Sequence, residues 1–214
     1  MKTDDLISML ANGAVAVEPN ALRRRYVAAL GWGAFGATLL MAIMLGVRPD
    51  LAEAALLPMF WGKLAFPFLL LAGALVATLR LSRPGMRLGR VPLVVMGMPV
   101  AVVWLVAAVM LSGAAPVIRD EMIFGASWMV CPMYIAALSA PAFVALLWAM
   151  KGLAPTHLVL AGAASGLLSG ALGALIYALH CPEMAVPFLA VWYLLGMLIP
   201  AAVGAVVGPL LLRW

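Results

Sequence analysis

Two cysteines stand out among the residues of this chain that could do chemistry. Cys131 and Cys181 are the only cysteines in 214 residues, and a proline follows each of them directly. The second lies in the run His180-Cys181-Pro182-Glu183, which places a thiol beside an imidazole and a carboxylate. These groups together bind zinc, cadmium or copper, and two thiols can form a disulfide in an oxidising compartment. We therefore expect the two cysteines to form one site.

The elements that position this site must be membrane-spanning helices. Hydrophobic residues make up 67% of the chain and charged residues only 10%, whereas a soluble domain carries charge on about a quarter of its residues. The length leaves room for roughly six spans of about 20 residues. The expected spans are 26–47, 58–79, 91–111, 128–150, 157–179 and 185–212. The sequence therefore predicts an all-α membrane protein with six transmembrane helices.

The distribution of basic residues predicts the orientation of these helices. The odd-numbered loops and their edges hold Arg48, Lys63 and Arg119. The termini and even-numbered loops hold the other ten, namely Lys2, Arg23, Arg24, Arg25, Arg80, Arg83, Arg87, Arg90, Lys151 and Arg213. Because basic loops stay in the cytoplasm, we expect both termini there, in a bacterial inner membrane, with both cysteines on the outer side. Lys63, near the start of the second span, is expected to extend to the interface.

The outer position leaves several roles open for the cysteines. Neighbouring helices could bring the start of the fourth span and the fifth loop within disulfide reach. The pair could be a structural disulfide, two inert buried thiols, or a site that responds to redox state or metal. In the last case Cys131, Cys181 and His180 are candidate ligands of a transient heavy-metal ion, with Glu183 and Glu121 as auxiliary ligands. No other cofactor is indicated.

Prolines recur at a fixed step in the chain. Pro58 and Pro67 are nine residues apart, as are Pro132 and Pro141, and the segment 182–188 resembles a shortened third copy. This spacing predicts three helical hairpins. The alternative is that proline is simply common in the first turn of a helix.

Small residues recur every four positions in the fifth span. Gly162, Gly166, Gly170 and Ala174 form this stripe. Such a stripe allows close approach of another helix, so we expect it to serve packing rather than chemistry.

The polar leader, residues 1–25, is expected to be a unit distinct from the transmembrane domain 26–214. Thr3 is a suitable N-cap, and Asp4 and Asp5 fall in the first turn, where the helix dipole favours negative charge. Its apolar face consists of Leu6, Ile7, Met9 and Leu10. A helix this short needs a partner, which could be another protein or the membrane surface beside the run Arg23-Arg24-Arg25.

These features together resemble one family. The leader Lys2-Thr3-Asp4-Asp5-Leu6-Ile7, six spans with both ends inside, and the Cys-Pro sites at 131–132 and 181–182 resemble the NrsF-like membrane anti-sigma factors. These are negative regulators of an extracytoplasmic-function sigma factor. The resemblance implies that the cytoplasmic part holds the sigma factor and that the cysteines release it under metal or oxidative stress.

The leader has the chemistry for such a partner. A sigma factor presents basic surfaces to promoter DNA, so an acidic amphipathic helix can bind it. The expected contacts are Asp4, Asp5, Leu6, Ile7, Met9 and Leu10. The expected partners are therefore the sigma factor and the lipid bilayer, with no direct contact to nucleic acid.

Other functions fit the sequence less well. It contains no Walker motif, no Gly-x-Ser-x-Gly, no His-Glu-x-x-His and no Cys-x-x-Cys, so we do not expect an enzyme. A small metal-binding transporter or channel is an alternative, but it would need polar groups inside the spans. A structural scaffold would need the glycine stripe but neither cysteine.

Overall fold

The computed structural model describes residues 3, 5, 7–8 and 20–213 and contains only helices, turns and loops in these residues. Six helical segments are long and apolar enough to cross a membrane. They are α2 (Ala21–Met44), α4 (Pro58–Leu81), α5 (Arg90–Gly113), α7 (Cys131–Lys151), α8 (Leu158–Tyr177) and a last segment made of α9 (Val186–Phe188), the π-helical turn η1 (Leu189–Tyr193) and α10 (Leu194–Leu211). The predicted all-α fold with six spans is confirmed.

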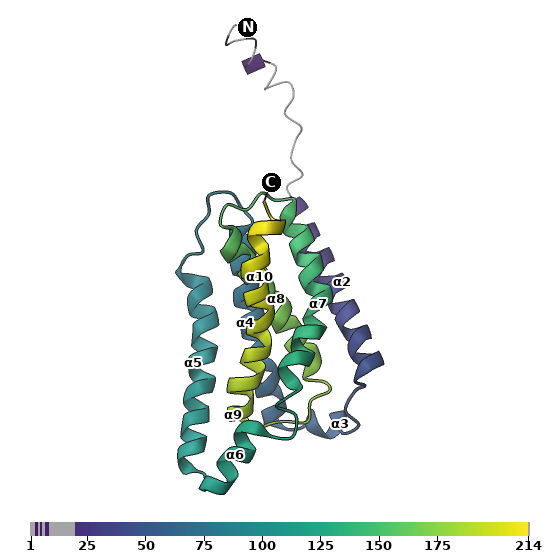
Figure 1. Cartoon of the computed structure of the whole chain (residues 1–214), viewed down its shortest axis with the longest axis vertical. Coiled ribbons are helices and arrows are strands. Elements are labelled where there is room, and N and C mark those ends of the chain that lie inside the picture. The colour runs from purple at the N-terminus through teal and green to yellow at the C-terminus, as the bar shows by residue number, and fades with distance from the viewer. Residues whose placement is uncertain (1–2, 4, 6, 9–19, 214) are drawn as a thin grey trace.

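Several helix ends lie a few residues from the predicted ones, and two short helices were not predicted. Helix α2 begins at Ala21, so the three arginines at 23–25 belong to its first turns. Two short helices, α3 (Leu51–Ala54) and α6 (Pro116–Phe124), occupy loops in which we expected no helix. Pro116 suits the first turn of α6, and Gly125, with φ +53°, ends it. Both short helices lie at the same end of the bundle (Figure 1).

Helix α8 forms the centre of the bundle. It packs against α10, α4, α7 and α2. In the most apolar stretch of α8, 67% of the residues are buried, against 11% in the corresponding stretch of α5. Helix α5 packs against α4, α9 and η1 and stands at the edge of the bundle (Figure 1). The most hydrophobic helices are thus not equally buried, as expected where lipid solvates the outer faces.

The glycine stripe of α8 does serve packing. A Cβ at Gly162 would overlap the Gly204 carbonyl, one at Gly166 would overlap the Pro200 carbonyl, and one at Gly170 would lie 2.7 Å from the Met197 carbonyl oxygen. All three carbonyls belong to α10, so the two helices meet backbone to backbone. Close contact of this kind drives helix association in lipid, where burial of apolar surface contributes little.

The proline repeat is not accompanied by repeated hairpin packing. Helices α4 and α7 both carry a proline in the first turn and one inside the helix, at Pro67 and Pro141. However, the main partner of α2 is α7, and that of α5 is α4. Only the last expected hairpin, α8 with α10, is an extensively packed pair. The common proline spacing therefore describes individual helices rather than three equivalent hairpins.

The two ends of the bundle differ in content. The start of α2, the loops 82–89 and 152–157 and the end of α10 lie together, and we call this the terminal end (Figure 1). The opposite end, which holds α3, α6 and both cysteines, is called the cysteine end. At the terminal end the Tyr26 hydroxyl and Ser82 Oγ share a buried hydrogen bond of 2.5 Å. This bond joins α2 to the end of α4.

Candidate functional site

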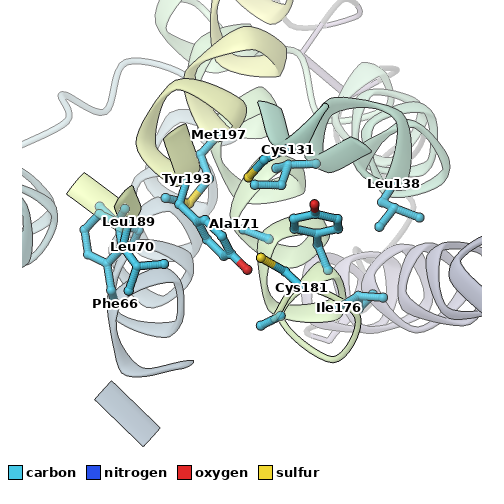
Figure 2. Packing of buried hydrophobic residues seen from close by; sticks show 14 of the residues in the cluster. Phe66, Leu70, Cys131, Leu138, Ala171, Ile176, Cys181, Leu189, Tyr193 and Met197 are labelled. Atoms are coloured by element: carbon cyan, nitrogen blue, oxygen red, sulfur yellow. The ribbon is translucent and has the colours of Figure 1, made fainter. Parts of the chain in front are cut away.

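The two cysteines come together from different elements. Cys131 is the first residue of α7, and Cys181 lies in the non-helical connection 178–185 that follows α8. The Cys181 amide donates to the Tyr177 carbonyl at 3.0 Å, which turns this connection back over the end of α8. Both side chains are fully buried free thiols in one core cluster (Figure 2).

Two tyrosines, Tyr177 and Tyr193, lie beside the thiols in the same buried cluster. Tyr177 interacts with both cysteines through its side chain, and its ring lies 5.9 Å from that of Tyr193, centroid to centroid. Figure 2 shows Tyr193 directed toward Cys181. The Tyr193 hydroxyl is buried and has no partner with hydrogen-bond geometry among the described residues. The thiols therefore lie in a packed apolar cluster, beside a buried hydroxyl that has no partner among the described residues.

The π-helical turn η1 sets the position of Tyr193. Its five residues, Leu189–Tyr193, widen the helix before α10. The Trp104 indole of α5 donates to the Ala190 carbonyl at 3.1 Å, and the Trp192 indole donates to the Ile123 carbonyl of α6 at 2.8 Å. Such turns are frequent at functional sites because they shift the following side chains out of the helical register.

A buried lysine holds the segment that carries Cys181. The Lys63 ammonium donates to the Cys181 carbonyl at 2.6 Å and to the Glu183 carbonyl at 2.8 Å. It also lies over the Tyr193 ring, 5.4 Å from the centroid. The prediction that Lys63 extends to the interface was wrong, because only 1% of the residue is exposed. Its side chain turns inward because non-helical carbonyls at membrane depth need a donor.

The loop before α3 contacts the same connection. The Arg48 amide donates to the Leu179 carbonyl at 3.1 Å, and its guanidinium reaches the Cys181 carbonyl at 3.4 Å. The same guanidinium forms an ion pair with Asp50 at 2.6 Å. Its hydrogen bonds hold the pKa of the Asp50 carboxyl below the usual value. The backbone around Cys181 is thus held from both α4 and the loop before α3.

Two of the proposed auxiliary ligands, His180 and Glu183, have other partners. His180 Nδ1 lies 2.9 Å from the Gly46 carbonyl oxygen, and the Glu183 carboxylate accepts from the Ala126 amide at 2.8 Å. Glu121 is exposed on α6. Within residues 20–213 and the few described leader positions, no group of three or more His, Cys, Asp or Glu is arranged to hold a metal ion. What the structure gathers is a pair of thiols, which can bind a soft cation alone.

The predicted partner-binding residues lie in the leader. Asp5 and Ile7 are exposed, and Ser8 Oγ donates to the Asp5 carbonyl at 2.9 Å. Asp4, Leu6, Met9 and Leu10 lie outside the described residues. The sequence reading missed Lys63, Tyr177 and Tyr193 at the thiol site. A signal existed for Lys63, since an ionisable residue within an apolar span usually marks a functional site.

The fold and site define a six-helix membrane protein with a buried thiol pair at one end. A model of the NrsF family, described as negative regulator of sigma F, matches residues 10–214, and the chain belongs to this family. The "Probable anti-sigma-F factor NrsF" of Azospira oryzae is 56% identical over 214 residues. The "Anti-sigma-F factor NrsF" of Caulobacter vibrioides is 41% identical over 216 residues. Both alignments cover 100% of both chains. The resemblance seen in the sequence is confirmed, and no solved structure matches the chain.

Proposed function

We propose that this protein is an inner-membrane anti-sigma factor that holds an extracytoplasmic-function sigma factor and releases it when Cys131 and Cys181 respond to metal or oxidative stress. The observation that carries the proposal is the end-to-end match to two relatives whose names state an anti-sigma-F role. The buried pair of free thiols supports the sensing part. Two thiols can lose two electrons and two protons to an oxidant and form a disulfide, or lose two protons to a soft cation.

The proposed orientation places the terminal end in the cytoplasm. Ten of the thirteen lysines and arginines belong to the termini and the even-numbered loops, and basic residues are retained on the cytoplasmic side. The leader then faces a cytoplasmic sigma factor, while the thiols face the oxidising side of the membrane. Signal and partner are thereby separated by the thickness of the bilayer.

Helix α4 offers a physical connection between them. Near its start Lys63 binds the connection that carries Cys181. Beyond its other end Ser82 shares a hydrogen bond with Tyr26 in the second turn of α2, the helix that follows the leader. A new bond at the thiols would displace the connection 178–185, and α4 would carry that displacement to the start of α2. We propose that the leader changes its accessibility in this way.

The test of partner binding targets the apolar face of the leader. Replacing Leu6 and Leu10 with Asp removes two apolar anchors, so we expect the sigma factor to leave the membrane fraction and its target genes to rise. Membrane abundance of the variant and pull-down from the cytoplasm are the measurements. Ser8→Asp is the control for added charge, because it introduces one of the two negative charges without removing an anchor. If the target genes stay silent while the double variant remains inserted, binding by the leader is refuted.

The thiol pair calls for single and double substitutions. If the cysteines act as one sensor, Cys131→Ser, Cys181→Ser and the double variant should have the same phenotype, because each destroys the same site. All three should insert and bind the sigma factor, yet fail to induce the target genes when cadmium or oxidant is added. Loss of abundance or constitutive release in the single variants would instead indicate a structural role. Normal induction in both would remove the cysteines from the mechanism.

A further inference from the structure

A hollow at the terminal end is lined by two basic side chains that have no role in the function proposed above. It measures about 260 Å³ and is lined by Arg25, Trp148, Ala149, Lys151 and Gly152. Arg25 belongs to the first turns of α2 and Lys151 ends α7, so the hollow lies where these two packed helices meet. We propose that it binds the headgroup of an anionic phospholipid.

Two cations converge on this hollow without an acid to neutralise them. Neither aspartate nor glutamate occurs among its lining residues. The Arg25 guanidinium lies against Gly152, where a Cβ would overlap its Nη1 atom. Lys151 in the last turn of α7 also faces the negative end of the helix dipole, which accounts for one cation there but not for a second from another helix. Basic pockets between transmembrane helices are typical sites for anionic headgroups.

The donors of Arg25 are available to a ligand. Both Arg25 and Lys151 are exposed, and among the described residues no carbonyl or carboxylate accepts a hydrogen bond from the Arg25 side chain. A guanidinium presents five donors in a planar fork that matches phosphate oxygens. The guanidinium can lie in this position because Gly152 has no Cβ.

Trp148 favours a lipid over a free phosphate. It precedes Lys151 by three positions on α7, so the two side chains share a face, and 77% of the tryptophan is exposed. Tryptophans gather at the membrane interface, where the indole lies at headgroup level. The hollow thus pairs charge for a phosphate with an apolar surface for the glycerol and first acyl carbons. A ligand with both features is a phospholipid.

A second basic hollow at the same end lacks this combination. It is lined by Val76, Leu79, Arg80, Arg83 and Met86, with no aromatic residue. The Arg80 guanidinium already donates to the Leu88 carbonyl at 3.2 Å, so part of its binding capacity is used within the protein. We therefore assign the lipid site to the hollow at Arg25 and Lys151.

The experiment uses the full-length protein, purified in neutral detergent, with phosphatidylglycerol or phosphatidylcholine added and binding followed by native mass spectrometry. We expect the wild type to retain phosphatidylglycerol preferentially, and Arg25→Gln or Lys151→Gln to weaken this binding roughly five-fold each. Arg87→Gln is the matched control, because Arg87 is exposed in the loop at the same end and lines neither hollow. It should bind like the wild type.

Three results would overturn the assignment. Equal binding of phosphatidylcholine would show that charge is not recognised. An equal loss in Arg87→Gln would show a general attraction to the basic end. Protection from thermal unfolding by inorganic phosphate alone, at the concentration effective for phosphatidylglycerol, would show that the lipid part is not recognised. Thermal unfolding of each variant without lipid separates loss of the site from loss of the fold.

Discussion

Gly166→Leu should prevent the bundle from assembling. A Cβ at this position would overlap the Pro200 carbonyl and come within 2.7 Å of the Ala201 Cα, and both atoms belong to the backbone of α10. Backbone cannot rotate away as a side chain can, so α8 and α10 would have to separate. Overpacking usually costs about 1–3 kcal/mol, and we expect a loss of free energy of unfolding of about 3 kcal/mol or more here. The folded fraction after detergent extraction, measured by size-exclusion chromatography, should collapse.

The matched control is Gly97→Leu on α5. Gly97 is also a helical glycine, but a Cβ there would meet no atom within 4 Å, and the residue is exposed. The same change of side chain therefore occurs on a face that we expect to contact lipid. The extracted Gly97→Leu protein should elute like the wild type. Equal loss of both variants would mean that glycine itself, rather than the contact between α8 and α10, is what the bundle requires.

Sequence alone could predict the spans because their signal is local. Six long apolar segments and the stripe at Gly162, Gly166 and Gly170 need only composition and helical period to be recognised. The helix partners could not be predicted in this way. Which helix α2 or α5 packs against depends on surface shapes formed by residues far apart in the sequence, so the hairpins suggested by Pro58 and Pro132 did not indicate the observed packing.

The thiol site was only partly predictable for a similar reason. That Cys131 and Cys181 lie at the same end follows from counting spans. The direction of the Lys63 side chain does not, because a lysine near a membrane interface can extend outward or turn inward with the same backbone. The direction of the Lys63 side chain is decided by the Cys181 and Glu183 carbonyls, which accept its hydrogen bonds. These carbonyls are free to accept because the segment leaves the helix after Tyr177.

The assignments of His180 and Glu183 show the same limit. Their position beside Cys181 suggested shared ligation, yet the His180 ring and the Glu183 carboxylate bond to the loops at Gly46 and Ala126. Neighbours in a non-helical segment point in different directions, so proximity in sequence does not gather them around one ion. Both residues instead fix the connection in which Cys181 lies.

Lys63→Met should free the segment that carries Cys181. Methionine reproduces the extent of the lysine side chain except for its terminal nitrogen, and the change leaves the Glu183 carbonyl without a side-chain donor among the described residues and the Cys181 carbonyl with only the longer contact from Arg48. A hydrogen bond to a charged group contributes about 1.5–3 kcal/mol, while removal of the buried ammonium relieves a desolvation cost of several kcal/mol. Global stability should therefore change little, whereas the connection 178–185 should open more often.

The measurement is the rate at which a membrane-permeant maleimide modifies each cysteine, followed by mass spectrometry. Loss of the two Lys63 hydrogen bonds should raise the rate at Cys181 by about tenfold or more, with a smaller rise at Cys131, which belongs to a helix. Arg119→Met is the matched control, since this residue at the cysteine end is exposed and its side chain donates only to the Ala114 carbonyl among the described residues. If Lys63→Met leaves the Cys181 rate at that of the control, Lys63 does not hold the thiol segment, and the proposed connection through α4 loses its starting point.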